Sequence, residues 1–305
     1  MQITIGSRGS ELALTQTKWV QGQLLNLGLK TEIKIIETKG DQILDVALHK
    51  IGDKGLFTAE LEEALRTGEI QLAVHSFKDL PTLASVELPI VAIPPRESPW
   101  DCVVFSQKFE GLASILDLPK KSIIGTSSLR RVQQLKHHRP DFEFLPIRGN
   151  VGTRLQKIKE GREGLCAGIL AEAGLNRLGL QKVIGQVLPL ELCIPAPAQG
   201  ALAVQSSQKA LDSYPELVEA LKQINDTEDK VNLVKAERAA LQAIEGGCQT
   251  PFAAYAQKIN EKTFRIKGFI GDPKTNKVAF AEEIGELGDS IGIGKRLGLR
   301  LKNLI

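Results

Sequence analysis

The chain has 305 residues, which is longer than a single hydrophobic core usually needs, so its length favours two or three domains. Hydrophobic residues make up 42% and charged residues 25% of it, as in folded globular proteins, and no apolar run is long enough to span a membrane. The formal net charge is only +3, and no basic run is interleaved with aromatic residues. We therefore expect neither a nucleic-acid partner nor a membrane partner.

The N-terminal stretch MQITIGSRGSELAL enters a strand pattern almost at once and lacks the basic and long apolar regions of a secretory signal. Four cysteines are widely separated, without the CxxC pairs or Cys/His spacing of a zinc site. We therefore expect no metal, and reduced thiols in the cytoplasm, or in an organellar stroma if a transit peptide has been removed. The four are Cys102, Cys166, Cys193 and Cys248.

Over the first two-thirds of the chain, short apolar runs alternate with helical patterns, which predicts parallel sheets covered by helices on both faces. Strands are predicted at QITIG, KTEIKIIET, IQLAVHS, SIIGT, FEFLPIR and GILAEAGL, and helices over 11–27 and 58–66 and from about 128 and 153. Two proline-bearing stretches, AIPPRESPW at 92–100 and IPAPAQG at 194–200, predict linkers between domains. The alternative is that these prolines only end strands.

After about residue 226 the pattern changes to a capped helix, EDKVNLVKAERAALQAI, three extended runs and a final amphipathic helix. The runs FAAYAQKI, KTFRIKGFIG and KVAFAEEI are separated by turns, which predicts an antiparallel three-stranded meander. The predicted fold is α/β, with two doubly wound domains and a small C-terminal α+β domain. The predicted boundaries are 1–95 with 199–220, 99–195, and 225–305.

Three times, a predicted strand is followed by a turn of small residues and by arginine where a helix begins. A cation there meets the positive end of the helix dipole and costs about 0.3 to 1 kcal/mol. For any one of these arginines, the alternative is an exposed side chain on a loop whose charge is solvated by water. Three cases at the carboxyl edge of a sheet, where α/β proteins bind ligands, indicate a ligand with several carboxylates or phosphates. The arginines are Arg8, Arg130, Arg131, Arg148 and Arg154, and the accompanying hydroxyls are those of Thr126, Ser127 and Ser128.

The stretch LAVHSFKDLPT ends a predicted strand and places His75, Lys78 and Asp79 near its end. Nearby guanidiniums would keep Asp79 ionised, so it could stabilise a developing cation or relay a proton. The alternatives are that Asp79 only begins a turn, that His75 is a packed strand residue, and that Lys78 forms a Schiff base instead of binding an anion. Lys54, between two glycines, indicates either a mobile flap or an ordinary surface turn.

Eight motifs in this order over nearly the whole chain make the sequence similar to the porphobilinogen deaminase family, also called hydroxymethylbilane synthases. They are GSRGSELAL, KGLFTAELEEAL, AVHSFKDLPT, GTSSLRR, IRGNVGTRL, AGLNRLGL, PAPAQGA and EGGCQTP. The resemblance implies two domains like periplasmic binding proteins, a third small domain, and a monomer. It implies a transferase of tetrapyrrole biosynthesis that joins four porphobilinogen molecules head to tail, with loss of ammonia, and releases hydroxymethylbilane by hydrolysis. Each pyrrole carries an acetate and a propionate, which are the carboxylates that the arginines suit.

The resemblance also implies the roles of individual residues. Cys248 would carry a dipyrromethane cofactor through a thioether, and Asp79 would stabilise positive charge on the pyrrole nitrogens and on the azafulvenium cation left by deamination. Lys54 and Phe57 would belong to a flap over the site. The implied cofactor contacts are Ser76, Lys78, Thr126, Ser127, Ser128, Arg130, Arg131, Arg148, Gly149 and Arg154. The implied substrate contacts are Arg8, Ser10, Arg148, Arg154, Arg177 and Gln199.

A two-lobed module that binds polycarboxylates without chemistry is the alternative function, but it leaves the glycine-flanked thiol unexplained. For a tethered, growing chain, glycines beside the anchor allow a close approach that a helix would deny. The stretch PAPAQG carries a proline and an alanine where Val-Gly is frequent in the family, which would stiffen the second linker.

Overall fold

The computed structural model describes residues 2–38, 58–82, 85–245 and 250–305, and the chain divides into two compact units. Unit 1 comprises Met1–Glu97 and Ala201–Val231, and unit 2 comprises Ser98–Gly200 and Asn232–Ile305. The first two boundaries thus fall at the two proline-bearing stretches. Unit 2 contains both the second and the third sheet, so the predicted division into three domains remains a prediction.

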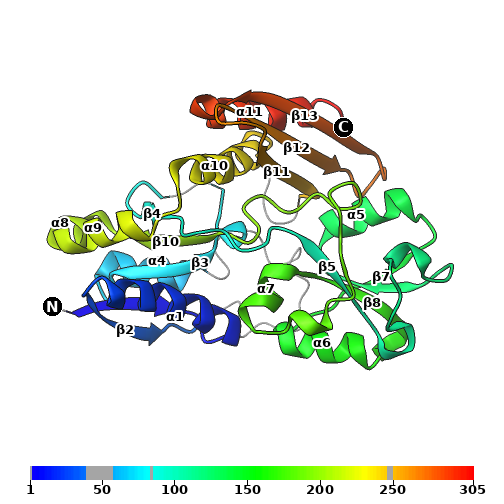
Figure 1. The fold of residues 1–305 in the computed structure, drawn as a ribbon, viewed down its shortest axis with the longest axis horizontal. Helices are drawn as coiled ribbons and strands as arrows, with labels where there is room; N and C mark the ends of the chain where they lie inside the picture. The colour runs from blue at the N-terminus through cyan, green and yellow to red at the C-terminus, as the bar shows by residue number, and fades with distance from the viewer. Residues whose placement is uncertain (1, 39–57, 83–84, 246–249) are drawn as a thin grey trace. The chain divides into compact units, whose positions relative to one another are not determined.

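A five-stranded sheet in the order β2-β1-β3-β10-β4 forms the centre of unit 1 (Figure 1). Strand β1 pairs in parallel with β2 and β3, whereas β10 pairs antiparallel with β3 and β4. The sheet is therefore mixed: the predicted parallel pairing is present among β2, β1 and β3, whereas β10 runs antiparallel because the chain enters it beside the carboxyl end of β3. The strands are β1 (Gln2–Ser7), β2 (Lys30–Ile35), β3 (Leu72–Ser76), β4 (Ile90–Ala92) and β10 (Leu202–Ser206).

Side chains on successive strand positions of unit 1 pack against two different sets of helices. Leu72 and Val74 of β3 lie in a core with α1 and α9, whereas Ala73 between them packs in a second core with α4. Thr58 occupies the N-cap position of α4, but its side chain makes no capping hydrogen bond. The helices are α1 (Glu11–Asn26), α4 (Ala59–Thr67), α8 (Gln208–Ser213) and α9 (Pro215–Ile224), with a 3-10 turn η1 (Phe77–Asp79) after β3.

Unit 2 begins with a second five-stranded sheet, in the order β7-β6-β8-β5-β9. Strand β6 pairs in parallel with β7 and β8, and β5 pairs antiparallel with β8 and β9. In both sheets the fourth position is thus held by an antiparallel strand that follows a proline-bearing stretch. The elements are β5 (Asp101–Phe105), β6 (Ile123–Gly125), β7 (Glu143–Leu145), β8 (Leu165–Ala171), β9 (Gln186–Val187), α5 (Leu129–His138), α6 (Val151–Lys159) and α7 (Glu172–Arg177).

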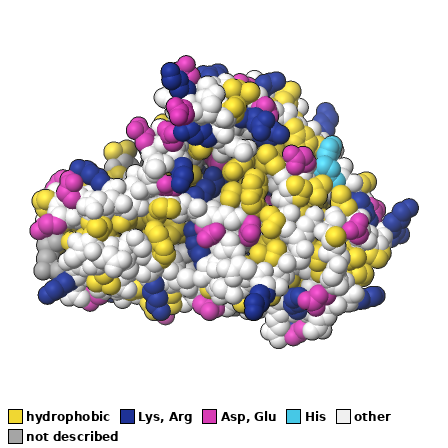
Figure 2. All heavy atoms as spheres, viewed as in Figure 1, with side chains coloured by type: hydrophobic (Ala, Val, Ile, Leu, Met, Phe, Trp, Pro, Cys, Tyr) yellow, Lys and Arg dark blue, Asp and Glu magenta, His cyan; other side chains and the backbone are white. Residues whose placement is uncertain are grey.

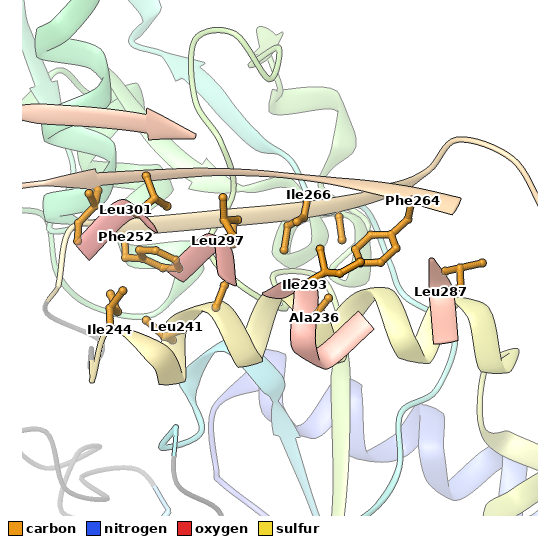
Figure 3. Close-up of a cluster of buried hydrophobic side chains, with 14 residues drawn as sticks. Ala236, Leu241, Ile244, Phe252, Phe264, Ile266, Leu287, Ile293, Leu297 and Leu301 are labelled. Atoms are coloured by element: carbon orange, nitrogen blue, oxygen red, sulfur yellow. The ribbon is translucent and has the colours of Figure 1, made fainter. Parts of the chain in front are cut away.

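The C-terminal part of unit 2 is the predicted meander, with strand order β11-β12-β13 and antiparallel pairing throughout. Its core lies between the sheet and two helices, and Figure 3 shows Phe252, Phe264 and Ile266 of the sheet packed with Ile293 and Leu297. The elements are β11 (Phe252–Lys258), β12 (Thr263–Gly271), β13 (Val278–Glu286), α10 (Glu228–Ala243) and α11 (Ser290–Lys302).

Basic and acidic side chains are interspersed over the face shown in Figure 2, as expected for ordinary surface charge. Among the helices of the described residues, none is both long and apolar enough to cross a membrane.

Helix α11 approaches α10 closely at a glycine, and we predict that this position tolerates no side chain. A Cβ atom on Gly294 would lie 2.2 Å from the backbone oxygen of Ala236. We expect Gly294→Ala to lower the free energy of unfolding by about 1 to 3 kcal/mol, because the two helix backbones must separate. Urea unfolding measures the effect. The control is Gly288→Ala, where a Cβ meets nothing within 4 Å, and equal losses in both variants would contradict the packing argument.

Candidate functional site

The carboxyl ends of the parallel strands in unit 1 hold five of the predicted residues. Strand β1 ends at Ser7, Arg8 follows half-buried, and Ser10 caps α1 by accepting a hydrogen bond from the Ala13 N–H at 3.3 Å. The neighbouring parallel strand β3 ends at Ser76 and leads to Lys78 and Asp79 in η1. The predicted strand, turn and helix order is therefore confirmed.

Asp79 is exposed at the end of η1, and its carboxylate makes no hydrogen bond or ion pair with another described residue. The turn that carries it is well anchored, because the Phe77 N–H donates to the Ala201 carbonyl at 3.0 Å. Just before the turn, the buried amide of Gln16 and the hydroxyl of Ser76 exchange hydrogen bonds of 2.9 and 3.3 Å. Gln16 was not predicted, although its position two turns after the Ser10 cap could have indicated it.

His75 is buried on β3, which confirms the packed-residue alternative for this histidine. Its pKa is lowered to about 4, first by burial and further by the charge of Arg8, against a hydrogen bond with Gln205. The folded protein therefore resists protonation at this position between pH 6.5 and 4, whereas the unfolded chain accepts the proton. Stability must fall as the pH falls through this range.

We accordingly expect the protein to lose about 2 to 3 kcal/mol of stability at His75 when the pH is lowered from 7 to 4.5. Urea unfolding at both pH values, with the native protein and with His75→Gln, isolates this contribution. The variant should show a correspondingly weaker pH dependence. Equal pH dependence in the two proteins would contradict it.

The corresponding edge of the second sheet carries the predicted hydroxyls and Arg148. After β6, Thr126 is buried and Ser127 donates to the Ile147 carbonyl at 2.8 Å. After β7, Arg148 is half-buried, and its guanidinium has no hydrogen bond or ion pair with any part of the chain that the structure describes. The donor set of this edge can therefore receive carboxylates, with Arg148 available to a ligand.

The turn between Arg148 and α6 has little freedom. Gly149 has φ +110°, where a side chain is strained, and a Cβ would also lie 2.9 Å from the side chain of Thr153. The helix begins with Asn150 as its cap, accepting from the Thr153 N–H at 2.8 Å, and Arg154 lies half-buried in its first turn. The predicted start near residue 153 was thus about two residues late.

Arg130 and Arg131 are both buried and share an internal carboxylate. Asp101 accepts from Arg130 Nη1 at 2.7 Å and from Arg131 Nη2 at 2.7 Å. Burial raises the pKa of Asp101, but the two arginine charges outweigh it and hold that pKa far below its usual range. Asp101 therefore supplies part of the negative charge that the sequence pattern predicted for a bound ligand. Their contact with a cofactor remains a prediction.

Gln199 and Arg177 also have partners within unit 2. Gln199 is fully buried, and its amide donates to the Pro99 carbonyl at 2.8 Å and to Asp101 Oδ1 at 2.9 Å. Arg177 Nη2 donates to the Gly200 carbonyl at 2.7 Å. These donors fix the segment around 199–200, and the substrate contacts predicted for both residues remain predictions.

Three residues of the implied site, Lys54, Phe57 and Cys248, lie outside the described residues. Of the other cysteines, all free, Cys102 and Cys193 are buried, and their burial raises each thiol pKa to about 12. Within the described parts of the chain, no group of three or more His, Cys, Asp or Glu side chains could hold a metal ion.

Two models of one protein family match most of the chain. The family model described as "Porphobilinogen deaminase, dipyromethane cofactor binding domain" matches residues 3–213, and that of the "Porphobilinogen deaminase, C-terminal domain" matches 231–303. The porphobilinogen deaminase of Listeria welshimeri is 46% identical over 95% of this chain and 92% of its own. That of Clostridioides difficile is 41% identical over 100% and 97%.

Among solved structures, the methionine-binding protein MetQ aligns with a TM-score of 0.45 and 11% identity, over 72% of this chain and 90% of its own. The two family models together match residues of both units. The chain belongs to the porphobilinogen deaminase family of transferases.

Proposed function

We propose that this protein joins four porphobilinogen molecules head to tail on a dipyrromethane primer attached to Cys248 and releases hydroxymethylbilane by hydrolysis. The match of both family models over nearly the whole chain carries this proposal. The dipyrromethane, when bound, supplies the terminal pyrrole from which the chain grows.

The carboxyl edge of each five-stranded sheet carries donors that suit such ligands. Arg148 offers a guanidinium without a partner among the described residues, and Ser127 and Ser128 lie at the start of α5 with at least partly accessible side chains. Planar guanidiniums bind carboxylates in bidentate fashion, and each pyrrole brings an acetate and a propionate. We assign Arg8, Ser10 and Arg154 to the same task, because each lies where a helix begins after a strand of the sheet.

Asp79 is assigned the chemical role. Each addition breaks the C–N bond of the substrate's protonated aminomethyl group and a C–H bond of the terminal pyrrole, forms a C–C bond between the two rings, and releases ammonia and one proton. Departure of ammonia leaves positive charge on the substrate pyrrole. An exposed carboxylate on an anchored turn can stabilise that charge without first breaking an internal ion pair.

The attachment of the primer to Cys248 is supported by the state of two other thiols. Thioether formation requires a reactive thiol, and the thiolate is the nucleophilic form. Because the pKa values of Cys102 and Cys193 are raised to about 12 and both side chains are buried, neither is suited to the reaction.

Intact mass of the freshly purified protein, an Ehrlich colour reaction and incubation with porphobilinogen test the proposal together. We expect added mass equal to two pyrrole units on the peptide that contains Cys248, and release of ammonia with formation of the linear tetrapyrrole. An unmodified protein that binds porphobilinogen but releases no ammonia would instead be a carboxylate-binding module.

A further inference from the structure

A buried polar cluster surrounds Asp101 in unit 2. Asp101 is fully buried, and its two oxygens accept from both neighbouring arginines, from the Gln199 amide and from the Cys193 thiol, at distances between 2.7 and 3.3 Å. Burial raises the pKa of the Cys193 thiol to about 12. The thiol therefore stays protonated and donates to Asp101 Oδ2.

The topology of the sheet explains how residues about thirty positions apart meet there. Strand β5 runs antiparallel to β8, so its first residue, Asp101, lies beside Ala171 at the end of β8. Strand β6 runs parallel to β8, so α5 begins at the same edge. Asp101, the first residue of β5, therefore lies beside the first turn of α5, where it pairs with Arg130 and Arg131.

The carboxylate fixes the orientation of both guanidiniums. Arg131 reaches Asp101 Oδ1 through Nε at 3.0 Å and Nη2 at 2.7 Å, and its Nη1 donates to the Ile169 carbonyl at 2.8 Å. Arg130 reaches both carboxylate oxygens and donates from Nη1 to the Ile194 carbonyl at 2.8 Å. Each guanidinium is therefore held by a charged and a backbone acceptor, which leaves little rotational freedom.

Charge at this cluster is only partly balanced. Two buried guanidiniums share one carboxylate, so one positive charge remains, and removing such a charge from water without a partner is costly. Thr126 and Ser128 lie in the turn directly before α5, whose first turn carries both arginines, and the Ser128 N–H donates to Thr126 Oγ1 at 3.2 Å. The remaining charge is therefore placed at the edge that carries the hydroxyls.

We propose that Asp101 is a positioning residue of the cofactor site, which orients Arg130 and Arg131 and neutralises one of their charges, so that the pair receives a single pyrrole carboxylate. This inference rests on the proposed function. Asp101 itself does not touch the ligand, because its six hydrogen bonds to protein donors leave no accessible oxygen. Its effect is transmitted through the two arginines.

The test uses the full chain with Asp101→Asn, which removes the charge at nearly constant size, and Asp101→Glu, which keeps the charge but displaces it by one methylene. The fraction of folded, monodisperse protein that carries the two-pyrrole mass is measured by intact mass spectrometry. We expect it to fall by about tenfold or more in Asp101→Asn. In Asp101→Glu, which is the safer variant for folding, we expect a smaller loss and a higher KM for porphobilinogen with little change in kcat.

The matched control is Asp141→Asn. Asp141 pairs with Arg139 at 2.8 Å, immediately after the C-terminal end of α5. The Asp141→Asn variant therefore removes an arginine–aspartate pair of the same unit that lies outside the Asp101 cluster. Full occupancy is expected in this variant. Native occupancy and KM in the Asp101 variants, or equal losses in Asp141→Asn, would overturn the inference. If the native protein itself carries no pyrrole mass and releases no ammonia, the proposed function fails instead.

Discussion

Replacing Asp79 with asparagine is expected to reduce turnover by about 10² to 10⁴-fold and to leave the fold intact. The carboxylate is exposed and makes no hydrogen bond or ion pair within the described residues, so its loss removes no stabilising interaction with them. It does remove the negative charge that we assign to the cation formed when ammonia leaves. Consumption of porphobilinogen measures turnover, and thermal unfolding measures the fold.

Glu219→Gln is a suitable control, because Glu219 is an exposed carboxylate of the same unit, and its ion pair among the described residues is with Lys222, at 2.7 Å on α9. It should retain full activity and stability. The role assigned to Asp79 is rejected if purified Asp79→Ala forms product at the native rate.

Replacing Cys248 with alanine is expected to abolish stable attachment of the dipyrromethane and, with it, all product formation. The thiol is the proposed site of the thioether, and alanine offers no atom to which a pyrrole could bond. Two measurements follow the effect, the intact mass of the purified protein and the Ehrlich reaction of the denatured, washed chain. Both should show the unmodified polypeptide.

Cys166→Ser provides the control for this loss. Cys166 is half-buried and lies in the second sheet, so its replacement tests whether any partly accessible thiol suffices. We expect the full two-pyrrole mass in Cys166→Ser. A Cys248→Ala protein that still carries this mass on another residue would show that the assignment of the attachment site is wrong.

The regular elements were largely predictable because their periodicity is local. The helix predicted over 11–27 is α1, and the three extended runs of the C-terminal part are β11, β12 and β13. The run GILAEAGL shows where this fails: β8 ends at Ala171 and α7 begins at Glu172, so the segment divides between a strand and a helix. Both halves are apolar, and periodicity in such short runs cannot separate them.

Strand direction was less predictable, because it depends on how the chain returns. The runs DCVVF and LAVQS, which form β5 and β10, are both antiparallel to a neighbour that alternation alone would make parallel. Each follows a proline-bearing stretch without an intervening helix, and that is the sequence feature that distinguishes them.

At the candidate site, the sequence indicated the arginines but not their internal partner. Asp101 contacts Arg130 and Arg131 across about thirty residues, a separation that no local pattern encodes. One signal was present: the otherwise apolar run DCVVF begins with a carboxylate, which a buried strand accepts only when it is paired. The absence of any acidic residue from the first turn of α5 was a complementary signal.

The placement of β10 between β3 and β4 also constrains the order in which a ribosome can complete the two large sheets. The second sheet has all its strands once Val187 has been synthesised, whereas the first lacks an inner strand until residues 202–206 emerge. While residues 93–201 are being synthesised, the edges of β3 and β4 that later pair with β10 have no partner strand. Unpaired strand edges can pair with strands of other chains. Of the two five-stranded sheets, the one whose first strand is synthesised earlier is therefore completed later.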